Sequence, residues 1–192
     1  TNMIKKVTVV GTGVIGNGWI SRFLSQGYDV VATDIAENAE VRMRQSVDNA
    51  WPVLEKQGLA KGASKDRLKF EPDLSKAVVD ADLIQENVPE RESLKRTVLA
   101  EIDRFSKSEA IIASSTSGLK PSTLQEYCQR PERVIVAHPF NPVYLIPLVE
   151  LVGGKDTSSE IVKISEQFYQ SIKMKPLVIS TEVEGHVADR LM

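Results

Sequence analysis

The chain has 192 residues, of which 42% are hydrophobic and 26% charged, which is typical of a globular domain with a buried core. Its net charge of −2 comes from interspersed acidic and basic residues, so nucleic acid is not expected as a partner. No apolar run approaches the ~20 residues of a membrane span, and the N-terminus lacks a signal-peptide pattern. The single cysteine, Cys128, excludes an internal disulfide and favours a cytoplasmic location, and no metal-ligand cluster stands out beside the two histidines.

The first strand-like run, residues 7–10, breaks into the pattern Gly-x-Gly-x-x-Gly and then continues with helical spacing of apolar residues. Gly11 allows a tight turn, Gly13 the close approach of phosphates, and Gly16 the close packing of helix on strand. The helix directs its N-terminal N–H groups at this turn, which suits a pyrophosphate. The predicted cofactor-binding residues of the turn are Gly11, Thr12, Gly13, Val14, Ile15 and Gly16.

A second strand, residues 28–33, ends at Asp34, 18 residues after Gly16. A carboxylate in this position accepts hydrogen bonds from the adenosine ribose hydroxyls and repels a 2′-phosphate, so it favours NAD over NADP. The alternative is an aspartate that caps the next helix and binds no ligand.

The remaining chain alternates between helical and strand patterns. Loops at the expected carboxyl ends of strands are 11–16, Asp34, 86–90, 114–118 and 138–141. The alternation predicts a Rossmann-type fold, which is a doubly wound, mostly parallel sheet with helices on both faces. Ligands bind beyond the carboxyl ends of the strands in such a sheet. The predicted helices are 14–26, 37–57 (kinked or split at Pro52), 73–80, one opened by Pro89, a short one from Pro121, 157–171 and one from Val183; the later strands are 68–70, 81–86, 110–114, 133–137, 148–152 and 174–180.

Two residues near the end of the sheet suggest acid–base chemistry. His138 follows one apolar strand, and Glu150 is the only charge in the next. A buried, unpaired carboxylate costs several kcal/mol, so Glu150 requires a partner. Pro139 and Pro142 stiffen the connection and can fold the second strand back towards the first. A His–Glu pair fixes the imidazole tautomer and raises the histidine pKa, which suits a base that takes a hydroxyl proton. The alternative is a structural histidine, with Glu150 on an exposed edge.

The glycine triplet, residues 115–119, residues 138–143 and residues 148–150 together resemble the 3-hydroxyacyl-CoA dehydrogenase family across essentially the whole chain. The resemblance implies that His138 is the base and Glu150 its orienting partner. It also implies that Ser117 hydrogen-bonds the reacting oxygen near the nicotinamide. The residues that the resemblance places at NAD are Glu90, Lys95, Ser117 and Asn141. Ser117 and Asn141 are also expected to face the substrate. The alternative for Glu90 and Lys95 is that they belong to a solvated helix start.

Departures from that family concern the substrate. Ala50 and Gln57 stand where CoA-using members carry serine and lysine, and Asp189 replaces a substrate-facing asparagine. Residues 86–91, 114–119 and 137–154 resemble the branch that oxidises the 3-hydroxyl of L-carnitine with NAD. Asp189 and Tyr144 are then candidates for holding its quaternary ammonium, although a helix cap or salt bridge also accounts for Asp189. The alternatives are an L-3-hydroxyacyl-CoA (3-hydroxybutyryl-CoA) dehydrogenase of fatty acid metabolism, an L-gulonate-type enzyme, and a non-catalytic, crystallin-like NAD-binding protein.

The family resemblance also predicts the domain organisation. Residues 1–182 form the NAD-binding domain, and residues 183–192 begin an all-helical domain that closes over the substrate and makes a homodimer. We therefore expect the chain as given to bind NAD but to have little dehydrogenase activity alone.

Overall fold

The computed structural model describes residues 4–180 and residue 182. The predicted start of a second domain at residue 183, and Asp189 within it, lie outside the described residues. The strands are β1 (Lys6–Val10), β2 (Asp29–Thr33), β3 (Leu68–Phe70), β4 (Leu83–Glu86), β5 (Ile111–Ser114), β6 (Val134–Pro139), β7 (Leu148–Gly153) and β8 (Lys175–Ile179). The helices are α1 (Val14–Ser25), α2 (Ala39–Gln57), α3 (Leu74–Val78), α4 (Glu92–Phe105), α5 (Pro121–Leu124) and α6 (Ser159–Ser171), with 3₁₀ turns η1 (Lys65–Arg67) and η2 (Pro131–Arg133).

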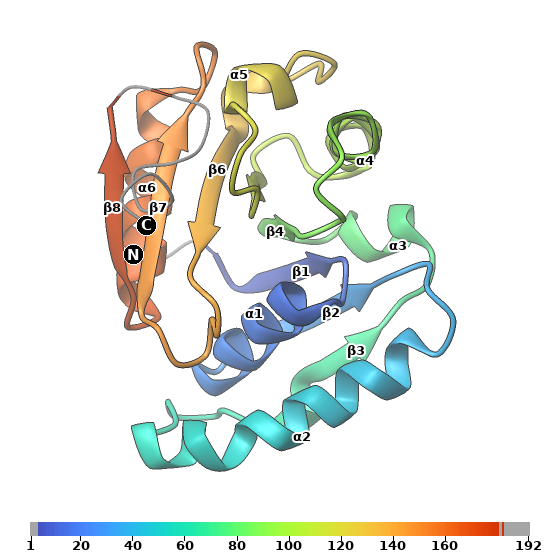
Figure 1. Cartoon of the computed structure of the whole chain (residues 1–192), viewed down its shortest axis with the longest axis vertical. Coiled ribbons are helices and arrows are strands. Elements are labelled where there is room, and N and C mark those ends of the chain that lie inside the picture. Colours follow the sequence, from blue (N-terminus) through green and yellow to red (C-terminus); the bar gives the residue numbers. More distant parts are fainter. Residues whose placement is uncertain (1–3, 181, 183–192) are drawn as a thin grey trace.

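The strands form one eight-stranded sheet in the order β3-β2-β1-β4-β5-β6-β7-β8 (Figure 1). Neighbouring strands are parallel except for β6 and β7, which are antiparallel. The chain moves outward in one direction from β1 to β3 and in the other from β4, so the order reverses between β1 and β4. Ligands bind at this kind of reversal in doubly wound sheets. The predicted Rossmann-type, mostly parallel architecture is therefore confirmed.

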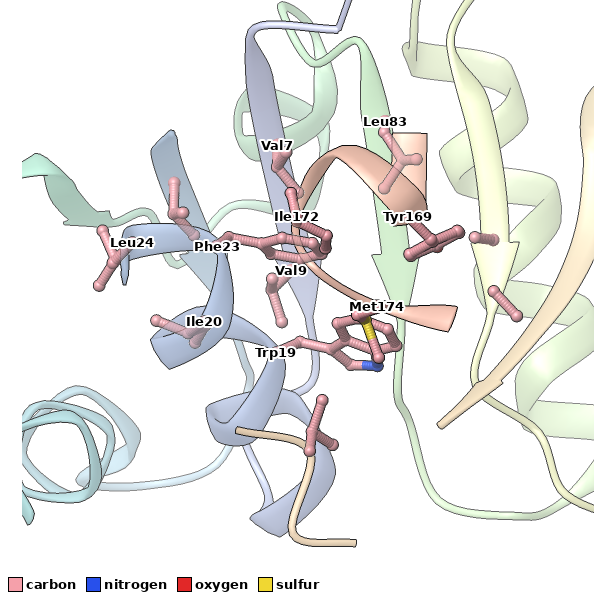
Figure 2. Packing of buried hydrophobic residues seen from close by; sticks show 14 of the residues in the cluster. Val7, Val9, Trp19, Ile20, Phe23, Leu24, Leu83, Tyr169, Ile172 and Met174 are labelled. Carbon is pink, nitrogen blue, oxygen red and sulfur yellow. The ribbon is translucent and has the colours of Figure 1, made fainter. Parts of the chain in front are cut away.

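Helices cover both faces of the sheet (Figure 1). The larger core joins the sheet to α1, α2 and α6, and Figure 2 shows Trp19, Phe23 and Tyr169 within it. The second core lies on the opposite face, where Val78 of α3, Leu99 and Ile102 of α4 and Leu124 of α5 pack on the sheet. Within the described part of the chain, no helix is long and apolar enough to cross a membrane.

The prediction for the second helix is a kink or a split at Pro52, and the split is wrong. Residues 39–57 form one continuous helix through Pro52. Pro52 is exposed, so water can hydrate the carbonyl that the missing proline N–H leaves without its helical partner. Trp51 and Leu54 on either side of it are buried, and this packing holds the helix together across the proline.

Two element boundaries near the predicted site also differ from expectation. Pro89 does not open a helix, because α4 begins at Glu92 after the N-cap residue Arg91. His138 does not follow its strand but belongs to it, since β6 continues to Pro139 by pairing with β7. Periodicity detects the apolar residues 134–137 but not the pairing that extends the strand.

Candidate active site

The glycine turn brings bare backbone close to neighbouring elements. Gly11 has φ +90, and a Cβ there would lie 2.8 Å from the carbonyl oxygen of Asn87. A Cβ on Gly16 would lie 1.8 Å from the carbonyl oxygen of Gly11, so only glycine allows α1 to start so close to β1. At Gly13, apart from the residue itself and its two chain neighbours, no atom of the described residues lies within 4 Å of the position that a Cβ would take, which leaves open space against the backbone. This geometry fits a pyrophosphate at the N-terminus of α1.

Asp34 ties the end of β2 to this turn. Its Oδ2 accepts hydrogen bonds from the backbone N–H of Thr12 (2.7 Å) and from Thr12 Oγ1 (2.8 Å), and its Oδ1 accepts one from the N–H of Ala36 (2.9 Å). Burial alone raises the pKa of Asp34, but the bonds from Thr12 and Ala36 outweigh it and leave the pKa below its ordinary value. The alternative role as a helix cap is wrong, because Asn38 is the N-cap residue of α2.

Two neighbouring cavities lie along the carboxyl ends of the parallel strands. The larger, about 670 Å³, is bordered by the glycine turn and by Asp34. The smaller, about 320 Å³, contains Ser117 and His138 in its wall. Both cavities are lined by Ile15, Asn87 and Val88, so they adjoin at this point. An extended dinucleotide placed on the glycine turn would lie in the larger cavity and reach the smaller one.

Glu90 and Lys95 belong to one network of charged and polar side chains. Lys95 Nζ lies 2.7 Å from Glu86 Oε2, with the two side chains 3% and 0% exposed, and 3.7 Å from Glu90 Oε1. Glu86 also accepts a 2.5 Å hydrogen bond from Ser114 Oγ, so this buried carboxylate is well paired. The solvated alternative is therefore wrong for Lys95, whereas the Glu90 side chain is 42% exposed and precedes the helix, which begins at Glu92.

Glu90 in turn holds the loop after β5. Its Oε2 accepts hydrogen bonds from the N–H (2.8 Å) and Oγ (3.0 Å) of Ser117, and its Oε1 accepts one from Thr116 Oγ1 (2.6 Å). Burial raises the pKa of Glu90, but the bonds from Thr116 and Ser117 and the charge of Lys95 leave it below the ordinary value. Glu90 therefore places the Ser117 hydroxyl at the wall of the smaller cavity.

His138 and Glu150 lie directly opposite each other in the antiparallel pair β6–β7. His138 Nδ1 is 3.8 Å from Glu150 Oε1, a distance of electrostatic contact rather than of a hydrogen bond. The His138 ring packs at 5.2 Å, centroid to centroid, against Phe140. Glu150 is 1% exposed on a strand flanked by β6 and β8, so its alternative placement on an exposed edge is wrong. The predicted fold-back of the second strand is confirmed.

Other predicted residues lie away from the cavities. Asn141 is exposed and Tyr144 is half-buried against the larger core, and neither borders either cavity. Ala50 is buried within α2, which weakens its use as an indicator of CoA specificity, whereas Gln57 is exposed at the end of that helix. The proposed ammonium-binding role of Asp189 stays a prediction.

Four polar residues at the site are not among those predicted from the sequence. Asn87, Ser115 and Thr116 line the smaller cavity, and Gln85 is fully buried beneath it. The sequence indicates these residues only through their position in two polar segments at strand ends, 85–90 and 114–118. The pattern there does not show in which direction each side chain points. Among residues 4–180 and 182, no group of three or more His, Cys, Asp or Glu side chains is placed to hold a metal ion.

Comparison with known proteins places this site in a family. The model of the 3-hydroxyacyl-CoA dehydrogenase NAD-binding domain matches residues 6–183. The chain belongs to the 3-hydroxyacyl-CoA dehydrogenase family. Its match to that family's NAD-binding domain confirms the predicted NAD cofactor.

Relatives of known name narrow the comparison. The chain is 88% identical over its whole length to an L-carnitine dehydrogenase of Bacillus cereus, and it spans 59% of that protein. It is 59% identical to an L-carnitine dehydrogenase of Oceanobacillus iheyensis, with 98% of the chain and 62% of the relative covered. Among solved structures, an NAD-dependent 5-formyl-3-hydroxy-2-methylpyridine 4-carboxylic acid 5-dehydrogenase superposes with a TM-score of 0.93 at 35% identity, covering 98% of this chain and 62% of the other. A 3-hydroxybutyryl-CoA dehydrogenase of Escherichia coli gives 0.84 at 26% identity, covering 91% and 38%.

Proposed function

We propose that the full-length protein oxidises the 3-hydroxyl of L-carnitine to 3-dehydrocarnitine, with NAD as cofactor. The observation that carries the reaction type is the placement of His138 opposite Glu150, at the wall of a cavity that adjoins the glycine turn. The choice of substrate rests on the 88% identity to a protein named L-carnitine dehydrogenase.

Four residues in or next to the wall of the smaller cavity have roles in this proposal. His138 accepts the proton of the 3-hydroxyl as its oxygen becomes a carbonyl oxygen. Glu150 faces Nδ1, so it stabilises the positive charge that the ring acquires and leaves Nε2 for the substrate. The Ser117 hydroxyl lies at the wall of this cavity with its proton directed to Glu90, and it turns from Glu90 to donate a hydrogen bond to the reacting oxygen when substrate is bound. When bound, NAD supplies the acceptor for the hydride that leaves carbon 3.

Removal of the base tests this assignment in the full-length protein. We expect His138→Gln to lower kcat for carnitine by at least about a hundredfold, because the amide cannot take the proton. The affinity for NAD, measured by isothermal titration, should change little because His138 does not border the larger cavity. Glu150→Gln should also lower kcat, whereas Glu160→Gln, an exposed change on α6, is the matched control. Unchanged turnover in His138→Gln would remove it from the mechanism.

The same assay separates the substrate classes. Wild-type protein that reduces NAD with carnitine, and is far slower in the reverse reaction with acetoacetyl-CoA and NADH, would support the proposed substrate. The opposite preference would assign the protein to the acyl-CoA-using enzymes that its structural neighbours include. Binding of NAD without turnover of either would indicate the non-catalytic alternative.

A further inference from the structure

The Ser115 hydroxyl lies at the centre of a set of hydrogen bonds beneath the two cavities. It donates to Asn87 Oδ1 at 2.6 Å and accepts from Trp19 Nε1 and Gln85 Nε2, both at 3.0 Å. These partners belong to α1, to β4 and to the connection between β4 and α4. The Ser115 network, made up of Ser115, these three residues and Tyr169, therefore joins segments that are distant in the sequence.

The direction of every hydrogen bond in the network follows from the chemistry of its members. Trp19 can only donate, and the buried Tyr169, whose pKa is raised by burial, remains a phenol that donates to Gln85 Oε1 at 2.6 Å. The carbonyl of Ala137 can only accept, which fixes the Gln85 amide with Nε2 towards Ala137 and Ser115 and with Oε1 towards Tyr169. Ser115 then receives two donors and has to direct its own proton to Asn87 Oδ1.

The two ends of the network reach the backbone at the two halves of the site. Asn87 Nδ2 donates to the carbonyl of Val10 (3.2 Å), the residue immediately before Gly11 in the glycine turn. Gln85 Nε2 donates to the carbonyl of Ala137 (3.3 Å), immediately before His138. Ser115 lies between these two amides, and it bonds to both.

We propose that Ser115 is a positioning residue, which holds the strand of His138 in register with the glycine turn through Gln85 and Asn87. The inference rests on the proposed function, because the glycine turn and His138 have to be aligned if hydride and proton are to leave the same substrate. Ser115 acts through these two amides and is not assigned any contact with the reacting atoms.

Removal of the hydroxyl in the full-length protein tests the role. Ser115→Ala leaves Trp19, Gln85 and Asn87 each without one partner, so the alignment loosens. A displacement of about 1 Å at a reacting centre costs up to about a hundredfold in rate, and we expect kcat to fall about ten- to a hundredfold. Ser115→Thr retains the hydroxyl and should recover most of that loss. The matched control is Ser106→Ala, which deletes a buried hydroxyl that bonds only its own helix at Ile102 and lies outside both cavities.

A spectroscopic measurement tests the network without turnover. The sequence has two tryptophans, Trp19 and Trp51, so the indole N–H region of a nitrogen-correlated NMR spectrum contains an internal control. Ser115→Ala should shift the Trp19 signal and speed its hydrogen exchange, while Trp51 on α2 and both signals of Ser106→Ala stay unchanged. An unmoved Trp19 signal, or a kcat within twofold of wild type in Ser115→Ala, would overturn the proposal.

Failure of the Ser115 proposal can be distinguished from failure of the proposed function. If wild-type protein does not oxidise carnitine, the substrate is wrong, and the kcat comparison is made on the substrate that is turned over. If no substrate is turned over, the shift of the Trp19 signal decides whether the Ser115 bonds exist, and an NAD affinity unchanged in Ser115→Ala would overturn the link from Ser115 to the glycine turn.

Discussion

At the scale of single residues, Asp34 does more than face a ligand. It accepts two hydrogen bonds from Thr12, and so it fixes the middle of the glycine turn from the end of β2. The same carboxylate lines the larger cavity, where it would meet the ribose of the cofactor. One side chain thus shapes the glycine turn, and we propose that it also selects the cofactor.

Replacement of this carboxylate tests both roles. We expect Asp34→Asn to weaken NAD binding about tenfold, since charge-assisted hydrogen bonds are lost, and to narrow the preference for NAD over NADP. Both affinities can be measured by isothermal titration. Asp29→Asn, at the exposed start of the same strand, is the control and should leave both affinities unchanged. An unaltered ratio of the two affinities in Asp34→Asn would contradict the selective role.

The lowered pKa of Asp34 gives this variant a pH dependence. A carboxylate with a folded-state pKa below its ordinary 3.8 stabilises the fold fully above that value, and the contribution is lost as the pH falls through the folded-state pKa. The free energy of unfolding of Asp34→Asn should therefore be lower than that of wild type at pH 7, and the difference should shrink below about pH 4. Denaturant titration at both pH values measures it.

At the scale of secondary structure elements, α4 is anchored to the sheet through a buried ion pair. Lys95, in the first turn of α4, reaches Glu86 at the end of β4, and Glu86 also accepts the N–H of Val88. The start of the helix and the strand end are thereby held together next to the loop that carries Glu90. The pair stabilises the geometry from which Ser117 is placed.

Breaking that pair should destabilise the fold strongly. Lys95→Met leaves the Glu86 carboxylate buried without its cation, which costs about 3–5 kcal/mol in comparable pairs. Denaturant titration of the wild type, of Lys95→Met and of Lys163→Met, an exposed lysine on α6, measures the effect against a matched control. The double change Glu86→Gln with Lys95→Met should recover part of the loss. A loss below about 1 kcal/mol in Lys95→Met would show that solvent reaches the carboxylate.

The sequence predicts most secondary structure elements but not the hydrogen bonds that individual side chains make across the site. Apolar periodicity and the glycine pattern located the elements, and two prolines indicated the return of β7 towards β6, because each signal is local in the chain. The helix start at Glu92 could not be predicted in this way, since Glu90 is directed to Ser117, 27 residues further on. The bonds made by Ser115 depend similarly on segments as distant as Trp19, 96 residues away.

At the scale of the whole molecule, the strand order reverses between β1 and β4 (Figure 1). The larger cavity borders the glycine turn after β1, and the smaller cavity adjoins it and reaches His138 on β6. Cofactor that binds only the folded state stabilises it according to its concentration relative to Kd. At a hundred times Kd, NAD should therefore add about 2.7 kcal/mol and raise Tm by about 5–10 °C. Differential scanning fluorimetry of the full-length protein measures this shift, with NADP at the same concentration as the comparison. Equal shifts for the two cofactors would contradict the selection by Asp34.

The antiparallel register of β6 and β7 sets His138 opposite Glu150 independently of the loop between the two strands. His138 faces Glu150 because ladder hydrogen bonds set the two strands in register, and not because residues 140–147 hold them there. Exposed side chains of that loop, such as Asn141 and Leu145, can therefore change while the two strands keep their register, whereas Phe140 packs against the His138 ring and Val143 is buried in the larger core. The proposed base would thus keep its facing carboxylate through changes at these exposed positions.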